Sequence, residues 1–258
     1  DYLLNWQAHI YQKPDDRTDI CLVFRGAHGT GKDSWNDVNE HVMGMSNHYL
    51  HRTAKMGEVL GNFNSSLKEK VMLQFNEVGA LDAAVYEDLF KDVITTDRLT
   101  INEKHLLPVY QTNYLNVMVF TNANKCPIKL EKGDRRFVAF KTSDKLKGDT
   151  EFFDKLHGLM QDQNWINHVY TFLMRRDLSN FVAKDDRPLT DEYLTSQALN
   201  IPDVFNFLHE QCDNDFEEWS DHTLPREGVP FKFLAKKNIK AAYADYRKEH
   251  FSAKEADN

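Results

Sequence analysis

The sequence lacks any long hydrophobic run. No stretch approaches the roughly 18–20 apolar residues that a helix needs to cross a bilayer, which argues against a membrane protein. Residues 1–6 carry no basic segment of the kind that opens a secretory signal. Position 1 is Asp rather than Met, so we expect a fragment or a processed chain. We expect a cytoplasmic location, in a host cell if a phage encodes the protein.

Cysteine and positive charge are also scarce. Cys21, Cys126 and Cys212 show no CxxC spacing, which argues against a disulfide framework or structural zinc and favours a reducing compartment. The 32 Lys and Arg residues are outnumbered by 40 Asp and Glu residues, for a net charge of −8. This balance excludes a protein that coats DNA with its whole surface, but it leaves room for one small basic element.

Short apolar runs alternate with helical stretches over residues 1–145, a pattern typical of an α/β fold. The expected buried strands are 20–24, 71–75, 115–120 and 137–140, and the expected helices are 1–13, 33–45, 52–60 and 82–94. Apolar residues then recur at helical spacing over 151–177, and shorter helices are expected at 191–199 and 239–251.

A phosphate-binding loop follows the first expected strand. The chain there reads Gly26-Ala27-His28-Gly29-Thr30-Gly31-Lys32-Asp33-Ser34, which is GxxxxGK between a strand and a helix. In such a loop the backbone N–H groups surround the phosphates, and the lysine reaches the terminal ones. The pattern asks for Ser or Thr where Asp33 stands. Either the Asp33 carboxylate meets Mg²⁺, or Ser34 takes part, or metal binding is weakened.

Polar residues close the next two strands. Glu77 follows strand 71–75, where an acid can polarise the water that attacks the γ-phosphate, and Asn76 would lie near the metal. Asn122 closes strand 115–120, where a neutral amide can hold the γ-phosphate or that water. Arg135 and Arg136 precede strand 137–140, and either guanidinium could reach a nucleotide on a neighbouring subunit. We favour Arg136, because it lies directly before the strand, although one of the two could instead pair with Asp134. The metal candidates are therefore Asp33, Asn76 and Glu77.

In this order, the motifs resemble those of the superfamily 3 helicases, a viral and plasmid branch of the AAA+ ATPases. The chain is most similar to the helicase module of phage and plasmid primase–polymerase proteins. Its lead-in Asn5-Trp6, its closing Asp134-Arg135-Arg136-Phe137 and its Arg176-Asp177-Leu178-Ser179 carry the likeness. The resemblance implies an α/β AAA+ core at 1–145 with a lead-in helix within 1–19, a helical extension at 146–200, and a winged-helix-like region at 201–258.

The resemblance also implies a β-hairpin that contacts DNA just before the third strand. Residues 98–102 and 106–110 are β-like runs on either side of a polar tip, Glu103-Lys104-His105. By resemblance, Lys104, together with His105, projects into the channel of a ring and binds a DNA phosphate. Six such tips would concentrate positive charge in the channel while the outer surface stays acidic.

The leading hypothesis is an ATP- and Mg²⁺-dependent DNA helicase that acts as a hexameric ring on single-stranded DNA in phage or plasmid replication. The resemblance implies 3′→5′ movement and a primase–polymerase domain on the same parent chain. One alternative is a nucleotide-binding ring scaffold with little turnover, which Asp33 and Asn76 keep open. The other is a P-loop nucleotide kinase, which needs neither an intersubunit arginine nor a DNA hairpin.

Overall fold

The computed structural model describes residues 1–44, 48–122, 126–199, 207–208, 240 and 242–247. The chain divides into two units, residues 1–199 and residues 200–258, and each is considered by itself. Among the described residues, no helix has both the length and the apolar character to cross a membrane.

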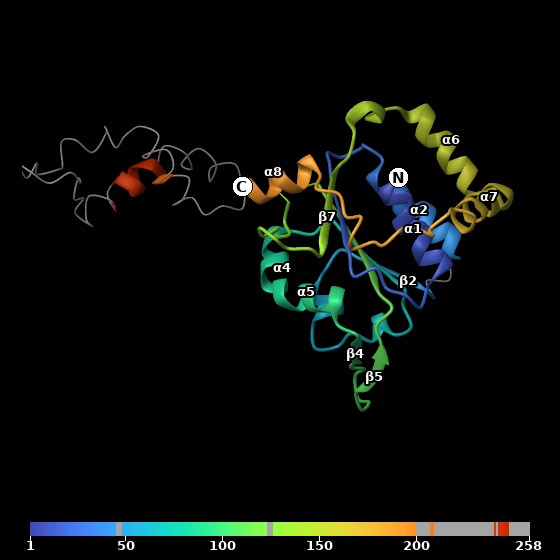
Figure 1. Ribbon diagram of the computed structural model, residues 1–258, viewed down its shortest axis with the longest axis horizontal. Coiled ribbons are helices and arrows are strands. Elements are labelled where there is room, and N and C mark those ends of the chain that lie inside the picture. Colours follow the sequence, from blue (N-terminus) through green and yellow to red (C-terminus); the bar gives the residue numbers. More distant parts are fainter. Residues whose placement is uncertain (45–47, 123–125, 200–206, 209–239, 241, 248–258) are drawn as a thin grey trace, which may run out of the picture. The chain divides into compact units, whose positions relative to one another are not determined.

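The first unit is built on a parallel sheet, which Figure 1 shows with helices around it. The sheet has five strands in the order β2-β3-β6-β1-β7. The strands are β1 (Cys21–Arg25), β2 (Leu50–Thr53), β3 (Met72–Asn76), β6 (Asn116–Thr121) and β7 (Phe137–Lys141). The four strands predicted from apolar runs are confirmed within one residue at each end. Because all strands run the same way, the carboxyl ends of β3, β6 and β1 lie next to one another at the same end of the sheet.

Both faces of the sheet are buried, which explains why its strands read as continuous apolar runs. Alternate residues point to opposite faces. Val23 and Val119 join one core cluster with α3 (Gly57–Leu60), α4 (Ala80–Val85) and α5 (Glu87–Thr95). Leu22 and Phe120 join the other with α1 (Tyr2–Gln12) and α7 (Gln163–Met174).

Two helix predictions differ from the structure. The segment 52–60 was expected to be one helix, but it begins within strand β2 and only α3 is helical. The β2 strand pairs with β3 at the sheet edge and is only partly buried, so it lacks the apolar run that marks a central strand. The segment 82–94 is two helices, α4 and α5, which meet at Tyr86. The helix α2 (Lys32–Met43) agrees with the prediction and ends at Gly44, whose φ is +86°.

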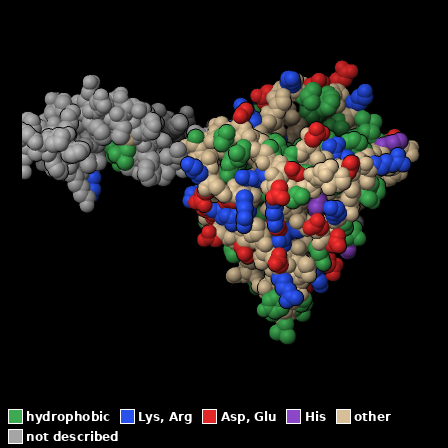
Figure 2. Space-filling view, viewed as in Figure 1, with side chains coloured by type: hydrophobic (Ala, Val, Ile, Leu, Met, Phe, Trp, Pro, Cys, Tyr) green, Lys and Arg blue, Asp and Glu red, His purple; other side chains and the backbone are tan. Residues whose placement is uncertain are grey.

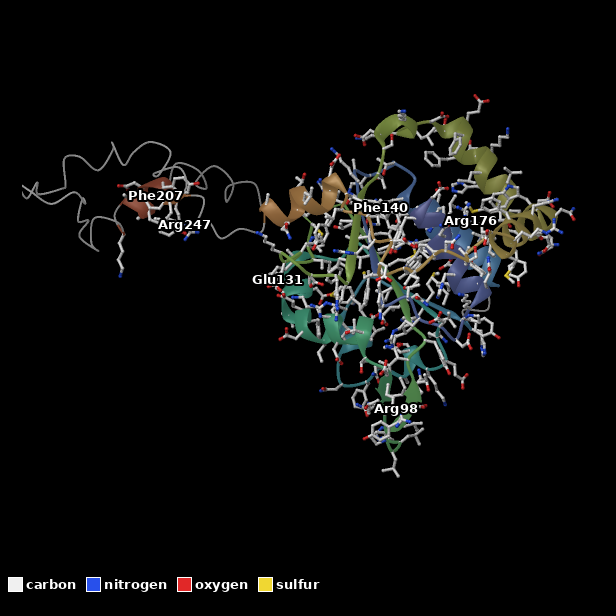
Figure 3. The ribbon with its side chains drawn as sticks, in the orientation of Figure 1. Arg98, Glu131, Phe140, Arg176, Phe207 and Arg247 are labelled. Atoms are coloured by element: carbon white, nitrogen blue, oxygen red, sulfur yellow. The ribbon has the colours of Figure 1, made fainter. Side chains whose placement is uncertain are left out.

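The predicted hairpin is present. Strands β4 (Arg98–Ile101) and β5 (Val109–Thr112) pair antiparallel in a separate two-stranded sheet. Asn64 holds the end of β4 nearest the tip: its Nδ2 donates to the Thr100 carbonyl at 2.9 Å, and its Oδ1 accepts from the Asn102 amide at 2.8 Å. Arg98 begins β4 at the opposite end of the hairpin, its base (Figure 3).

Three helices follow β7: α6 (Thr150–Met160), α7 and α8 (Asp191–Leu199), with a 3₁₀ turn, η2 (Asp144–Leu146), before them. Another 3₁₀ turn, η1 (Ser65–Leu67), precedes β3. Arg176 attaches α7 to α1 through an Nε donation to Asn5 Oδ1 at 2.8 Å. Glu192 attaches α8 to β1, because its Oε2 accepts from Arg25 Nη2 at 2.8 Å. The helical extension expected after the core is therefore packed onto the sheet and the lead-in helix.

In the second unit, the described residues form one small aromatic group. The Phe207 ring lies 5.4 Å from the Tyr243 ring and 5.3 Å from the Tyr246 ring. Residues 240 and 242–247 are helical, within the helix predicted at 239–251. Most of the predicted winged-helix-like region at 201–258, including Cys212, lies outside the described residues.

Candidate nucleotide-binding site

The predicted phosphate loop joins the end of β1 to the start of α2. Gly29 and Gly31 have φ values of +74° and +84°, a conformation that residues with a Cβ disfavour and that turns backbone N–H groups toward one concave side. Thr30 Oγ1 donates to the Ala27 carbonyl at 3.0 Å and closes the loop. The amides at the N-terminus of α2 therefore form a surface suited to phosphate oxygens.

Lys32 and Asp33 begin the helix that the loop enters. The Lys32 side chain is only 1 % exposed, and its Nζ lies 3.6 Å from Asp33 Oδ2. The Asp33 side chain is 49 % exposed and remains open to solvent. A buried ammonium needs nearby negative charge. Asp33 supplies part of it, and an anion held by the loop would supply more.

Glu77 and Asn122 meet at the ends of adjacent strands. The Glu77 amide donates to the Phe120 carbonyl at 2.8 Å, which extends the β3–β6 pairing by one bond. The Glu77 backbone has a φ of +54°, which is uncommon for a residue other than glycine. Asn122 Nδ2 donates to Glu77 Oε1 at 2.8 Å and lies 3.1 Å from Nδ1 of His28 in the phosphate loop. Three segments that the sequence separates therefore come together in one polar cluster.

The Asn76 side chain is engaged inside the protein. Its amide lies 2.9 Å from the Asn36 amide on α2. With the Asn76 oxygen toward Arg52, the Arg52 Nε and Nη2 donate at 2.7 and 2.8 Å. This orientation is the favourable one, because a guanidinium only donates. Arg52 also donates to Asp37 Oδ1 at 2.9 Å. The amide expected near the metal is thus held by Arg52, a residue that the sequence did not single out.

The two adjacent arginines before β7 have different surroundings. Arg136 is held by Asp134: its Nε and Nη2 donate to the two carboxylate oxygens at 3.0 and 2.9 Å. These hydrogen bonds raise the pKa of Arg136 above its usual range. Arg135 is exposed, and it forms no ion pair with any residue that the structure describes. The sequence favoured Arg136, but Asp134 engages that guanidinium, and Arg135 is the one of the two that is available to another molecule.

The hairpin lies at the opposite end of the sheet, where strand β6 begins. It leads into the start of β6, whereas Asn122 follows the end of that strand, so about 20 Å of strand separates them. Lys104 and His105 are exposed at its tip, as predicted. The tip also carries apolar side chains: Leu107 is 86 % exposed and Tyr110 is 73 % exposed. Figure 2 shows hydrophobic side chains gathered where the hairpin projects.

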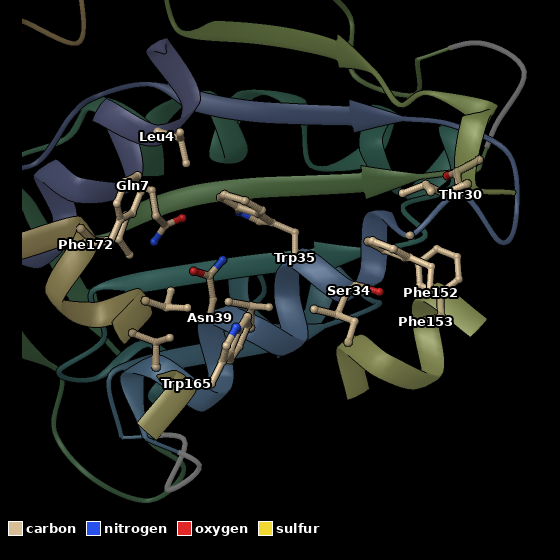
Figure 4. A pocket seen from close by; sticks show the side chains of 17 residues that line it. Leu4, Gln7, Thr30, Ser34, Trp35, Asn39, Phe152, Phe153, Trp165 and Phe172 are labelled. Carbon is tan, nitrogen blue, oxygen red and sulfur yellow. The ribbon is translucent and has the colours of Figure 1, made fainter. Parts of the chain in front are cut away.

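An apolar cavity of about 380 Å³ lies beside α2. It is reached from the phosphate loop at Thr30 and Ser34, and Trp35, Phe152 and Phe153 form part of its wall (Figure 4). Phe153 packs against the loop so closely that a Cβ at Gly31 would lie 2.7 Å from its ring. The cavity offers aromatic surface to a flat group attached to a phosphate in the loop.

Among the described residues, no group of three or more His, Cys, Asp or Glu side chains could hold a metal by itself. Mg²⁺ does not require such a cage, since it commonly binds through one or two carboxylates together with substrate phosphates and water. Asp33 meets this requirement, because its exposed carboxylate lies at the loop where the phosphates would be. Asn76 meets it less well, because Asn36 and Arg52 engage its amide.

The comparisons with known proteins bear on the fold. The chain superposes on the apo structure of the NrS-1 C-terminal region with a TM-score of 0.67 and 21% sequence identity, covering 94% of this chain and 58% of that one. The fold of this chain is similar to that of the NrS-1 C-terminal region. A second, A-form structure of that region also gives a TM-score of 0.67 and 21% identity, over 88% and 55% of the two chains. The chain thus spans little more than half of the length of that C-terminal region.

Other comparisons are less extensive. The profile of a family of unknown function, DUF5906, matches residues 24–136, from the end of β1 through Arg136. A JCV helicase structure aligns with a TM-score of 0.44 and 13% identity, over 81% of this chain and 60% of that one. No curated protein matches the sequence.

Two features of the site were not found from the sequence. One is the contact of Arg52 with Asn76, and the other is the contact of His28 with Asn122. The contact of Arg52 with Asn76 would have been predictable if strand β2, which contains Arg52, had been expected. Nothing local marks the second, because His28 occupies a variable position of the loop pattern.

Proposed function

We propose that this chain is the AAA+ ATPase module of a superfamily 3 DNA helicase, of the type found in phage and plasmid primase–polymerase proteins. One observation carries the proposal: the phosphate loop, Glu77 and Asn122 converge at the carboxyl ends of the parallel strands, and Asn122 donates a hydrogen bond to Glu77 at 2.8 Å. A phosphate loop beside an exposed carboxylate is the arrangement needed for hydrolysis of a nucleoside triphosphate. The motif order described above supports the helicase assignment.

In this proposal each residue has a separate task. The loop amides and Lys32 hold the phosphates and oppose their charge. Glu77 polarises the attacking water, and Asn122 keeps the Glu77 carboxylate in position. Mg²⁺, when bound with ATP, neutralises charge on the phosphates. We assign its protein ligand to Asp33 because that carboxylate is accessible, and we assign the base to the aromatic cavity beside α2.

A neighbouring subunit completes the site in this proposal. The γ-phosphoryl group gains negative charge during transfer, and an arginine from another subunit can accelerate the reaction about 10³–10⁵-fold. Arg135 is suited to this role because it is exposed, whereas Arg136 is held by Asp134. A hexameric ring would place Arg135 of each subunit at the next nucleotide.

The hairpin is the proposed DNA contact. Lys104 and His105 project from a two-stranded sheet, and Asn64 fixes the end of β4 nearest the tip, so a phosphate bound at the tip could transmit force to β6. Single-stranded DNA is the proposed ligand, and movement in the 3′→5′ direction rests on the family resemblance. A primase–polymerase domain on the same parent chain is proposed on the same ground.

ATP hydrolysis measured with and without single-stranded DNA tests the proposal. We expect hydrolysis that DNA stimulates, its loss in Lys32→Ala, and tight binding without turnover in Glu77→Gln. Lys155→Ala, on the exposed face of α6, is the matched lysine control and should behave as wild type. Tight ATP binding by the wild type without turnover would favour a scaffold. Phosphorylation of a nucleoside monophosphate would favour a kinase.

A further inference from the structure

A chain of hydrogen bonds links the phosphate loop to the proposed catalytic acid. Asn122 Nδ2 donates to Glu77 Oε1 at 2.8 Å and lies 3.1 Å from His28 Nδ1. The orientation of the Asn122 amide is determined by Glu77, because a carboxylate accepts and therefore requires the amide nitrogen. That nitrogen carries two hydrogens, one for each partner. His28 Nδ1 must then accept, which places the proton of the neutral imidazole on Nε2.

The positions of His28, Asn122 and Glu77 depend on these two hydrogen bonds, because few other contacts hold the Asn122 and Glu77 side chains. Among the described residues, Asn122 is the hydrogen-bond partner of the Glu77 carboxylate, whose side chain is otherwise exposed. The Asn122 Oδ1 is buried, and no described residue hydrogen-bonds it. Rotation of the Asn122 amide is therefore opposed by its two donated bonds, to Glu77 and to His28. Removing either bond weakens the restraint on the other.

We propose that His28 is a positioning residue for nucleotide hydrolysis: it holds the Asn122 amide, and the amide holds the Glu77 carboxylate in place for the attacking water. The inference rests on the proposed ATPase function and adds to it a residue in the phosphate loop. Because His28 belongs to the loop proposed to bind the phosphates, it couples the geometry of that loop to the position of the Glu77 carboxylate.

Two substitutions separate this role from a general structural one. His28→Ala removes the acceptor and should lower kcat about fivefold, which corresponds to the roughly 1 kcal/mol that one hydrogen bond contributes. Affinity for a non-hydrolysable ATP analogue should stay within about threefold, because the loop amides and Lys32 are unchanged. His28→Asn places an amide oxygen near the position of Nδ1, so kcat should return to within about threefold of wild type.

His41→Ala is the matched histidine control. His41 Nδ1 contacts the Asp37 carbonyl at 2.7 Å in the last turn of α2, away from the loop. This variant should keep wild-type kcat. A double-mutant cycle tests directly the relay of hydrogen bonds from His28 through Asn122 to Glu77. Once Asn122→Ala has removed the residue between the other two, adding His28→Ala should not lower kcat further.

The outcomes distinguish this inference from the proposed function. If Lys32→Ala abolishes hydrolysis but His28→Ala keeps or raises kcat, the relay is wrong and the ATPase assignment stands. Equal losses in His28→Ala and His28→Asn, or additive losses with Asn122→Ala, would also overturn the relay. If Lys32→Ala hydrolyses ATP normally, the proposed function itself is wrong.

Discussion

Arg136 and Asp134 form a two-point contact in which the guanidinium nitrogens lie 3.0 and 2.9 Å from the carboxylate oxygens. The Asp134 side chain is only 2 % exposed, and its Oδ1 also accepts from the Arg136 amide at 3.0 Å. The pair therefore supports the turn that leads into β7. Arg135, next to it in the sequence, takes no part in this contact and remains exposed.

The two arginines should accordingly fail in different ways. Arg136→Ala leaves the Asp134 carboxylate buried without its guanidinium and should lower the free energy of unfolding by about 1–3 kcal/mol, measured by denaturant titration. Arg135→Ala should leave stability unchanged and abolish ATP hydrolysis. Mixed with Glu77→Gln subunits, which are also inactive, Arg135→Ala should recover ATPase activity, because some sites then combine wild-type Glu77 with wild-type Arg135. Demonstrated subunit exchange without recovery would refute the intersubunit role.

Asp33→Ala should raise the Mg²⁺ concentration needed for nucleotide binding, measured by calorimetric titration at a series of Mg²⁺ concentrations. Asp154→Ala, an exposed acid on α6, is the control. Adding Asn76→Asp to Asp33→Ala should not restore the affinity, because Arg52 would pair with the new carboxylate. An unchanged Mg²⁺ dependence in Asp33→Ala would transfer the role to Ser34.

Lys104→Ala should weaken binding of single-stranded DNA. It should leave ATP hydrolysis without DNA intact, because the hairpin and Glu77 lie at opposite ends of the sheet. The slope of log affinity against log salt concentration should become shallower by about 0.7 for each lost phosphate contact. Fluorescence anisotropy over a range of salt concentrations measures both quantities. DNA binding identical to that of the wild type would remove Lys104 from the interface.

The contact of α8 with the sheet should depend on pH. Burial raises the pKa of Glu192, but hydrogen bonds from Arg25 and Ser196 outweigh it, so the pKa lies below the usual value for glutamate. A carboxyl with a lowered pKa in the folded state stabilises the protein above its unfolded pKa of about 4.3 and loses this contribution as the pH falls through the folded value. Glu192→Gln should therefore unfold more easily than wild type at pH 7.

The difference between Glu192→Gln and wild type should shrink as the pH falls from the unfolded pKa of about 4.3 through the lower folded pKa, where the wild-type carboxyl becomes protonated. Thermal unfolding at a series of pH values measures it. A difference that stays constant from neutral to acid pH would show that the Arg25–Glu192 contact does not contribute through its charge.

Local features of the sequence determined most of the core. The apolar runs at 20–24, 71–75, 115–120 and 137–140 became strands because a strand buried on both faces has few polar residues. The phosphate loop was predictable because its glycines and Lys32 act within one short segment. The hairpin at 98–112 was implied by the family resemblance, and the two β-like runs on either side of a polar tip agreed with it.

Only the tertiary structure decided the contacts between these segments. The edge strand β2 was missed because a half-exposed strand has no apolar run, and with it the contact of Arg52 with Asn76 was missed. The sequence favoured Arg136 over Arg135 as the intersubunit residue because it lies next to the strand, and only the contact of Arg136 with the buried Asp134 reverses that preference. His28, Glu77 and Asn122 lie far apart along the chain. They meet because parallel pairing places the ends of β1, β6 and β3 side by side, which depends on strand order and register rather than on any local pattern.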